Sequence, residues 1–134
     1  MVKLLRSRAA PTSDKPQVRF RMRVTVAEVI AIGPGKVALL EAVRDHGSIS
    51  AAAKQLDMSY RRAWVLVDET NRSLKKPAVE SGHGGQNGGG TALTPVGEQV
   101  IALYRTIEEK AAAACATELK ALTRLLAPPP SGDA

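Results

Sequence analysis

Aromatic side chains are almost absent from this chain, which has one Trp, two Tyr and one Phe among 134 residues. The hydrophobic core must therefore be built from Val, Leu, Ile and Ala, which suits closely packed helices better than a β-sandwich. Cysteine is equally scarce, and the single Cys115 excludes an internal disulfide and a zinc site made of cysteines alone. At this length we expect one compact domain with an extension, not two large domains.

Long apolar runs are also missing. No run approaches the roughly 20 residues that span a bilayer, and the N-terminus lacks the apolar stretch of a secretory signal. We therefore expect a cytoplasmic protein with no membrane partner. The chain also lacks a Ser/His/Asp set, paired carboxylates in an apolar pattern and a cluster of metal ligands, so we expect neither an enzyme nor a metal site.

Positive charge is what the chain has in excess, with a formal net charge of +6. Such a balance favours polyanions as partners, either nucleic acid or an anionic membrane surface. Residues 47–71 have the pattern of two short helices joined by a tight turn, and the second helix opens with Ser59, Tyr60, Arg61 and Arg62. A helix that buries one face and offers Ser and Arg near its N-terminus suits the major groove of DNA.

The first residues divide into two parts. Residues 1–16 are expected to form a disordered arm. Over residues 18–26, apolar side chains alternate with Arg19, Arg21 and Arg23, which predicts a strand with one buried face. Two interpretations of the arginine row stay open at this point, a solvated strand face or a second surface that contacts phosphates.

Three helices are predicted next. The first covers residues 36–46 and ends at Gly47, a residue type that commonly terminates helices. The second covers residues 49–56, with Ser48 as its N-terminal cap, and a short turn separates it from the third helix, which Ser59 caps.

The third helix carries an apolar stripe at helical spacing, which we expect to pack inward. This stripe consists of Tyr60, Ala63, Trp64, Val67 and Leu74. Trp64, the only tryptophan, is predicted to be the centre of the core. The residues turned away from the stripe are Arg61, Arg62, Val65 and Asp68.

Residues 78–80 and 91–93 flank the glycine-rich segment SGHGGQNGGG, and this arrangement predicts a β-hairpin. Thr94 and Pro95 are typical of the cap and first residue of a last helix, predicted to run for about 30 residues. The order strand, three helices, hairpin and long helix predicts a mainly α fold with a small β component. This is a winged helix-turn-helix with a long C-terminal dimerisation helix.

Three segments carry a family resemblance, namely GSISAAAKQLDMSYRRAW, GGQNGGG and LTPVGEQVIALY. Over about residues 33–112 the chain resembles the N-terminal DNA-binding domain of the molybdate-responsive ModE regulators, itself similar to the winged helix domain of LysR-type regulators. The resemblance implies that the helix from Ser59 is the recognition helix, the loop 82–90 the wing tip, and the helix from Thr94 the dimerisation element. ModE regulators bind molybdate in C-terminal Mop-type domains, and we expect this chain to act without them.

The site residues follow from these assignments. Those expected to contact double-stranded DNA lie on the second and third helices and in the wing tip: Ser48, Ser50, Lys54, Ser59, Tyr60, Arg61, Arg62, Val65, His83, Gln86 and Asn87. Those expected to pair two copies of the chain lie along the final helix: Val96, Val100, Leu103, Ile107, Ala111, Ala114 and Leu122. The expected division of the chain is an arm at 1–16, a winged helix-turn-helix at 17–93, a dimerisation helix at 94–126 and a disordered tail at 127–134.

The function expected from the sequence is that of a homodimeric transcription regulator, a repressor that binds a palindromic operator. No cofactor is expected, and molybdate is implied only by the resemblance. Two alternatives stay open: a regulator that senses an oxyanion directly in a crevice of the dimer, and a winged helix that binds proteins and has no DNA role. A separate protein that supplies the sensor domain is a further possible partner.

Overall fold

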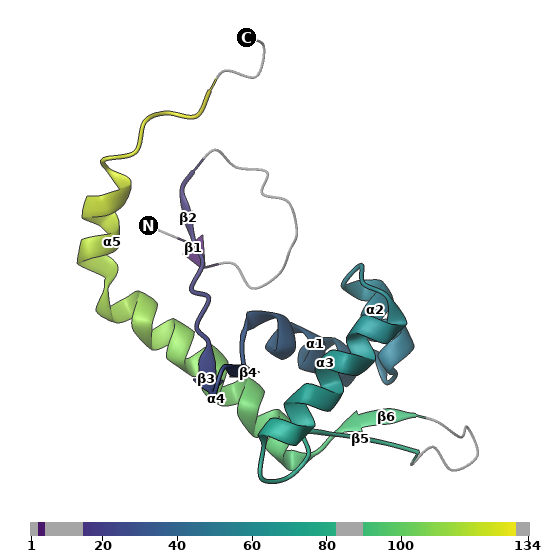
Figure 1. Cartoon of the computed structure of the whole chain (residues 1–134). Coiled ribbons are helices and arrows are strands. Elements are labelled where there is room, and N and C mark those ends of the chain that lie inside the picture. The colour runs from purple at the N-terminus through teal and green to yellow at the C-terminus, as the bar shows by residue number, and fades with distance from the viewer. Residues whose placement is uncertain (1–2, 5–14, 83–89, 131–134) are drawn as a thin grey trace. The chain divides into compact units, whose positions relative to one another are not determined.

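The computed structural model describes residues 3–4, 15–82 and 90–130 of the chain. Arg21–Thr106 is one compact unit, and the two ends, Met1–Phe20 and Ile107–Ala134, form another. The elements of the first unit, labelled in Figure 1, are β3 (Val24–Val26), β4 (Val29–Ile32), α1 (Pro34–His46), α2 (Ile49–Gln55), α3 (Tyr60–Ser73), β5 (Val79–Ser81), β6 (Thr91–Leu93) and the first part of α4 (Pro95–Ala114). The mainly α fold class is confirmed, and the three helices, the hairpin of β5 and β6 and the following helix come in the predicted order.

The ends of the first two helices are set by local sequence. Helix α1 begins at Pro34, where a missing N–H costs nothing. It ends at Gly47, whose φ of 76° lies in the left-handed region and whose N–H donates to the carbonyl of Val43 at 2.8 Å. The turn between α2 and α3 contains Asp57 at φ 57°, a conformation that Asp tolerates better than most residues.

The core of this unit is aliphatic, as the composition predicts. It lies between α1, α2, α3, α4 and the start of β5, and its buried members are Val37, Leu39, Leu40, Ala42, Val43, Ile49, Ala52, Ala53, Ala63, Val67, Ala78, Val79, Ile101 and Tyr104. The aromatic residue at its centre is Tyr104, which is 2% exposed and donates its hydroxyl hydrogen to the carbonyl oxygen of Met22 at 2.9 Å. Burial of the ring therefore leaves its polar atom paired.

The prediction that Trp64 is the centre of the core is wrong. Trp64 is 49% exposed, and Tyr60 of the same predicted stripe is 57% exposed. The side of α3 that faces the core is centred on Ala63, Val67 and Thr70, all of which are buried. Because successive helical residues are about 100° apart, Tyr60 and Trp64 fall at the margin of this face.

The prediction of one strand over residues 18–26 with a buried face is also wrong. The regular strand β3 covers only Val24–Val26 and pairs with β4 through a two-residue turn, Ala27 and Glu28, at φ 47° and 73°. Val24 and Val26 are 45% and 62% exposed. The reason is that β4, not β3, packs against α3, so β3 is the outer strand of a two-stranded hairpin.

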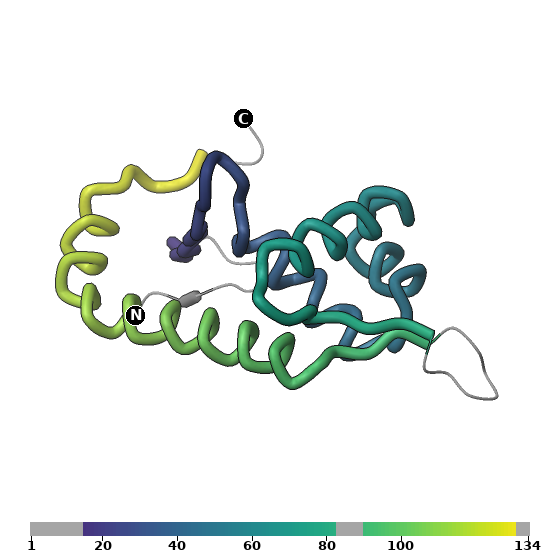
Figure 2. The backbone as a smooth tube through the Cα atoms, turned by 60° about the horizontal axis from the view of Figure 1, so that its bottom comes forward, coloured from purple at the N-terminus to yellow at the C-terminus, as the bar shows by residue number. Residues whose placement is uncertain are grey.

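The second hairpin matches its prediction. β5 and β6 run side by side in Figure 2 and pair in antiparallel register, with Val79 opposite Leu93 and Ser81 opposite Thr91. The N–H of Thr91 donates to the carbonyl of Gly47 at 3.0 Å, which ties β6 to the end of α1. The hairpin is therefore attached to the helical core along one of its strands.

Besides the hydrogen bond of Tyr104, two groups of polar contacts join α4 to the rest of the unit. At its N-terminus, the hydroxyl of Thr94 accepts from the N–H of Gly97 at 3.1 Å and donates to the carbonyl of Pro77 at 2.7 Å. One turn beyond Ile101, the guanidinium of Arg105 donates two hydrogen bonds, at 2.9 and 2.6 Å, to the carboxylate of Glu41 on α1. The predicted cap at Thr94 is thus confirmed, while the ion pair had no counterpart in the sequence analysis.

In the other unit, β1 (Lys3–Leu4) and β2 (Gln17–Val18) pair in parallel. The predicted 30-residue helix is interrupted: α4 ends at Ala114, and α5 (Ala116–Thr123) begins after Cys115, whose ψ of 12° departs from the helical value. Residues 127–130 have no regular structure, and the rest of the predicted tail, like most of the predicted arm, lies outside the described residues. Among the described helices, none is long and apolar enough to cross a membrane.

Candidate nucleic-acid interface

Two serine caps open the helices that would face DNA. The side chain of Ser48 accepts a hydrogen bond from the N–H of Ala51 at 3.0 Å, and Ser59 accepts one from Arg62 at 3.1 Å. Both predicted caps are therefore confirmed. A capping hydroxyl still has a hydrogen to donate, and Ser59 is exposed while Ser48 is half-buried.

The outer face of α3 is large, exposed and partly apolar. Tyr60, Arg61, Trp64 and Val65 line a shallow depression on this face. Their spacing of one, three and one residues places them on adjacent rows of the helix surface. Tyr60 and Trp64, which were predicted to pack in the core, thus form part of the exposed surface of α3.

Positive charge is concentrated at the N-terminal half of α3. The first turn of this helix has no acidic residue, and neither Arg61 nor Arg62 forms an ion pair with another residue in the part of the chain that the structure describes. Further along, Asp68 is paired with Arg72 at 3.0 Å, four residues later. The helix dipole adds to the positive potential at this end, so the surface suits an anion.

Helix α2 contributes polar groups at its exposed side. Ser50 and Lys54 are both exposed, and α2 has no acidic residue in its first turn. They precede α3 in the helix-turn-helix, where side chains of the first helix can reach a DNA backbone.

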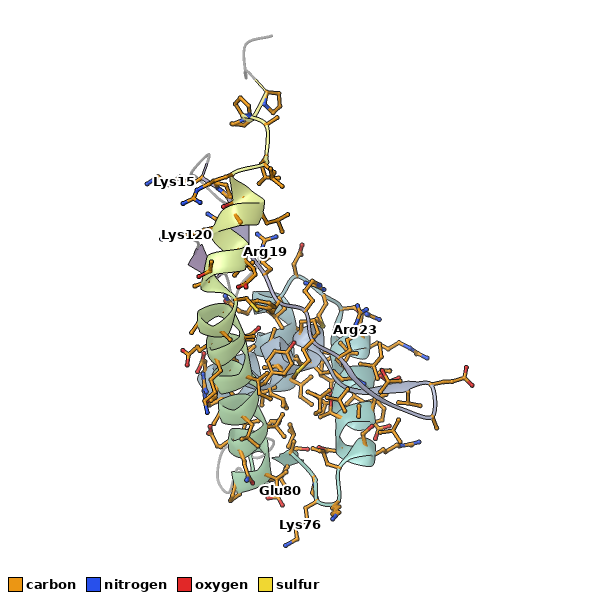
Figure 3. All side chains as sticks on the ribbon, turned by 90° about the vertical axis from the view of Figure 1, so that its left-hand side faces the viewer. Lys15, Arg19, Arg23, Lys76, Glu80 and Lys120 are labelled. Carbon is orange, nitrogen blue, oxygen red and sulfur yellow. The ribbon has the colours of Figure 1, made fainter. Side chains whose placement is uncertain are left out.

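Asn71, which the sequence analysis missed, fixes the start of the wing. Its side-chain oxygen accepts from the N–H groups of Ala78 at 2.8 Å and Val79 at 3.1 Å. Its amide nitrogen donates to the carbonyl of Val79 at 3.1 Å. The segment between α3 and β5 loops out around this contact, and Lys76 within it points away from the fold (Figure 3). An asparagine near a helix end is the one local signal that could have suggested such a role.

The tip of the wing cannot be compared with its prediction, because His83, Gln86 and Asn87 lie outside the described residues. The described base of the wing ends at Gly82, whose φ of 86° is in the left-handed region, and resumes at Gly90. The N–H of Gly82 donates to the carbonyl of Gly90 at 3.1 Å, so the two strands are closed at the base of the tip.

With this geometry in place, comparison with known proteins identifies the domain. The family of bacterial regulatory helix-turn-helix proteins of the lysR type matches residues 35–98. Residues 35–98 therefore match the LysR-type helix-turn-helix family. A crystal structure of a complex of the CbnR DNA-binding domain with DNA is similar to this chain with a TM-score of 0.52 and 24% identity, over 66% of this chain and 95% of that one. This likeness shows the fold, and it agrees with the winged helix-turn-helix prediction.

Several known proteins are similar to this chain over part of their length. Molybdenum-pterin-binding protein MopB of Rhodobacter capsulatus is 48% identical over 77 residues, which are 58% of this chain and 28% of that protein. Molybdenum transport protein ModE of Azotobacter vinelandii is 39% identical over 67% of this chain and 34% of its own length. DNA-binding transcriptional dual regulator ModE of Escherichia coli is 33% identical over 66% and 34%. The predicted resemblance to ModE regulators is confirmed, and the chain spans about a third of the length of these relatives.

Helix α4 has apolar residues both on the face that packs in the core and on its exposed side. Ile101 and Tyr104 are buried in the core. Of the residues predicted to pair two copies, Val100 is half-buried and packs against the core. Val96 and Ala111 are half-buried, while Leu103, Ile107 and Ala114 on α4 and Leu122 on α5 are exposed. Leu103 and Ile107, four residues apart, are 55% and 45% exposed. Leu103 and Ile107 are therefore a pair of exposed apolar side chains one helical turn apart on α4.

Three described arginines that precede residue 35, namely Arg19, Arg21 and Arg23, are exposed. Arg23 lies on the segment that leads into β3 (Figure 3), and Arg19 and Arg21 precede it. Exposure agrees with both interpretations of this row, a solvated face or a phosphate-contacting surface. In the described ranges, no group of three or more His, Cys, Asp or Glu side chains is placed to hold a metal ion.

Proposed function

We propose that this chain binds double-stranded DNA through α3 and the neighbouring side of α2, and that it controls transcription as a homodimer. The observation that carries the proposal is the outer face of α3, which presents Arg61 and Arg62 without an acidic neighbour in its first turn. The LysR-type match over residues 35–98 supports it, since α3 is the second helix of the helix-turn-helix.

The proposed contacts to DNA are of two kinds, those to base edges and those to phosphates. Arg61 and Arg62 can read guanine through paired hydrogen bonds or hold phosphates, and phosphate contacts from Ser50, Lys54 and Ser59 would fix the register on the duplex. The wing, which includes His83, Gln86 and Asn87, is proposed to lie against the backbone or the minor groove. Most of the affinity should come from phosphates, because counterion release makes the dominant sequence-independent contribution.

The homodimer is proposed to form through the exposed side of α4. Leu103 and Ile107 expose apolar surface that a second copy would remove from water. A two-fold axis would place two copies of α3 about one DNA turn apart, or a multiple of it, so the operator would be roughly palindromic. Leu103→Lys should convert the dimer to a monomer in analytical ultracentrifugation, whereas Ala102→Lys, at the exposed neighbouring position, should leave the dimer intact.

The test of DNA binding is fluorescence anisotropy with labelled duplexes from the genomic neighbourhood of the gene, over a salt series. We expect one fragment to be preferred and its affinity to fall steeply with salt. The double variant Arg61→Ala, Arg62→Ala should lose the preference and reduce the slope of log K against log salt by about two per protomer, and so by about four for the dimer, if both arginines hold phosphates.

The matched control is Lys75→Ala, Lys76→Ala, which removes the same charge from two exposed residues that lie beyond the C-terminal end of α3 at Ser73. This control should change the affinity less than twofold. Equal, weak binding to all fragments, with the same loss in both double variants, would refute site-specific binding. A parallel series with sodium molybdate tests a direct response to that oxyanion, which the names of the relatives make worth measuring.

A further inference from the structure

Trp64 lies on the surface of α3 and is not a member of the buried core. The core already has its aromatic residue in Tyr104, and the indole of Trp64 is 49% exposed. Tyr60 and Val65 beside it are 57% and 39% exposed. These three side chains, together with Arg61, line the depression on the outer face of α3. Such an apolar surface on a small domain indicates contact with something outside the chain.

The surroundings of this patch favour DNA over an apolar protein surface. Arg61 lies within the depression, Arg62 follows it, and the first turn of α3 contains no carboxylate. The patch also lies in the N-terminal half of the second helix of a LysR-type helix-turn-helix, the part of such a helix that meets base edges. An apolar patch framed by unpaired positive charge fits a polyanion that carries apolar groups in its groove.

Double-stranded DNA offers one such group. In the major groove, the C5 methyl of thymine is the apolar feature of an A·T pair, and apolar side chains contact it. We propose that Trp64 and Val65 read thymine methyl groups, so that the half-site opposite α3 contains A·T pairs with methyl groups facing the indole. Tyr60 borders the same patch, and Arg61 holds the adjacent phosphate or guanine. This inference rests on the proposed DNA binding and names the base chemistry that the site selects.

The decisive probe is a change in the DNA alone, so it does not depend on any variant folding. The fragment that the protein prefers in anisotropy is resynthesised with deoxyuridine in place of one thymine at a time, which deletes a single methyl group. We expect one or two positions in each half-site to lower the affinity about three- to fourfold per methyl. Replacing thymines outside the half-sites should leave the affinity unchanged, and these duplexes serve as internal controls.

A double-mutant cycle assigns the effect to the side chain. With Trp64→Ala, the loss at the sensitive positions should fall below about 1.5-fold, because the group that contacts the methyl is gone. Val65→Ala should weaken the discrimination partly, and Arg62→Ala should lower the affinity while it keeps the thymine-to-deoxyuridine ratio. Trp64 is the only tryptophan of the chain, so its emission should shift on binding the preferred duplex and not on binding heparin.

The outcomes separate this inference from the proposed function. A preferred fragment whose thymines can all be replaced without loss overturns the role of Trp64 and leaves DNA binding intact. The same result follows if Trp64→Ala and the parent protein show equal thymine-to-deoxyuridine ratios. If no fragment is preferred, and Trp64 emission responds only to a protein partner, the proposed function fails together with the inference.

Discussion

Gly97 and Gly35 occupy similar places in the sequence but should respond oppositely to the same substitution. Each lies in the first turn of a helix that begins with proline, Gly97 in α4 and Gly35 in α1. A Cβ added at Gly97 would lie 2.4 Å from the carbonyl oxygen of Ala78 and 3.3 Å from the side chain of Leu93. A Cβ added at Gly35 would meet nothing within 4 Å.

The expected magnitudes follow from two opposing effects. Alanine is favoured over glycine in a helix by about 0.5–1 kcal/mol, since it loses less backbone entropy on folding. At Gly97 the added Cβ would clash with the backbone oxygen of Ala78. This oxygen cannot move away easily, because it also accepts a hydrogen bond from the N–H of Thr94 at 2.9 Å. Overpacking of this kind costs about 1–3 kcal/mol or more. We therefore expect Gly97→Ala to lower the free energy of unfolding by about 1–2 kcal/mol, and Gly35→Ala to raise it by up to about 1 kcal/mol.

Thermal unfolding followed by far-ultraviolet circular dichroism measures both variants. At roughly 4 °C per kcal/mol for a domain of this size, the two midpoints should differ by about 4–12 °C, with the parent protein between them. Hydrogen exchange should show faster opening at β5 in Gly97→Ala, since Ala78 begins the wing. A Gly97→Ala protein as stable as Gly35→Ala would refute the argument from close approach.

Two further predictions concern contacts between distant parts of the chain. Asn71→Ala removes three hydrogen bonds at the base of the wing and should lower the free energy of unfolding by about 2–4 kcal/mol. Hydrogen exchange at Ala78 and Val79 should become faster, and unchanged protection there would contradict the proposed link. Glu41→Ala breaks an ion pair in which the side chain of Arg105 is 10% exposed and that of Glu41 is 23% exposed. The free energy of unfolding, measured with urea, should fall by about 2–3 kcal/mol, which is less than for a fully buried pair. A loss under 0.5 kcal/mol, within the range of surface pairs, would show that the pair contributes little.

The features that the sequence predicts well are those decided by a few neighbouring residues. Ser48, Ser59 and Thr94 cap helices with a hydrogen bond to an N–H three residues later, and Gly47 ends α1 in a left-handed conformation. These interactions need no knowledge of the rest of the fold. The hairpin of β5 and β6 was predictable for the same reason, because short extended pieces flanking a glycine-rich segment are a local signal.

The features that the sequence does not predict depend on residues far apart in the chain. Arg105 and Glu41 are 64 residues apart, and a chain with 19 basic and 13 acidic residues gives no means to select this pair. Asn71 bonds across a turn to residues seven and eight positions later. The break at Cys115 has no glycine or proline beside it to mark the end of α4.

The error at Trp64 has a different cause, because the pattern was correct and its interpretation was not. Apolar side chains at steps of three and four residues identify a helix face that avoids water, whether the covering surface belongs to the same chain or to a partner. On α3 the pattern includes Ala63, which the core covers, and Trp64, which it does not. On α4 it includes Leu103, predicted from the start to meet a second copy.

The size of the side chain at the margin of such a face can distinguish the two cases. A core that includes small residues such as Ala52 and Ala53 of α2 and Ala63 of α3, all of them buried, lets helices pack closely and leaves little room for an indole between them. A tryptophan one residue beyond a buried alanine is therefore forced toward the outside, where only a partner can cover it. For α3 the proposed partner is DNA, and replacing thymine with deoxyuridine tests whether the methyl group of the base covers the indole.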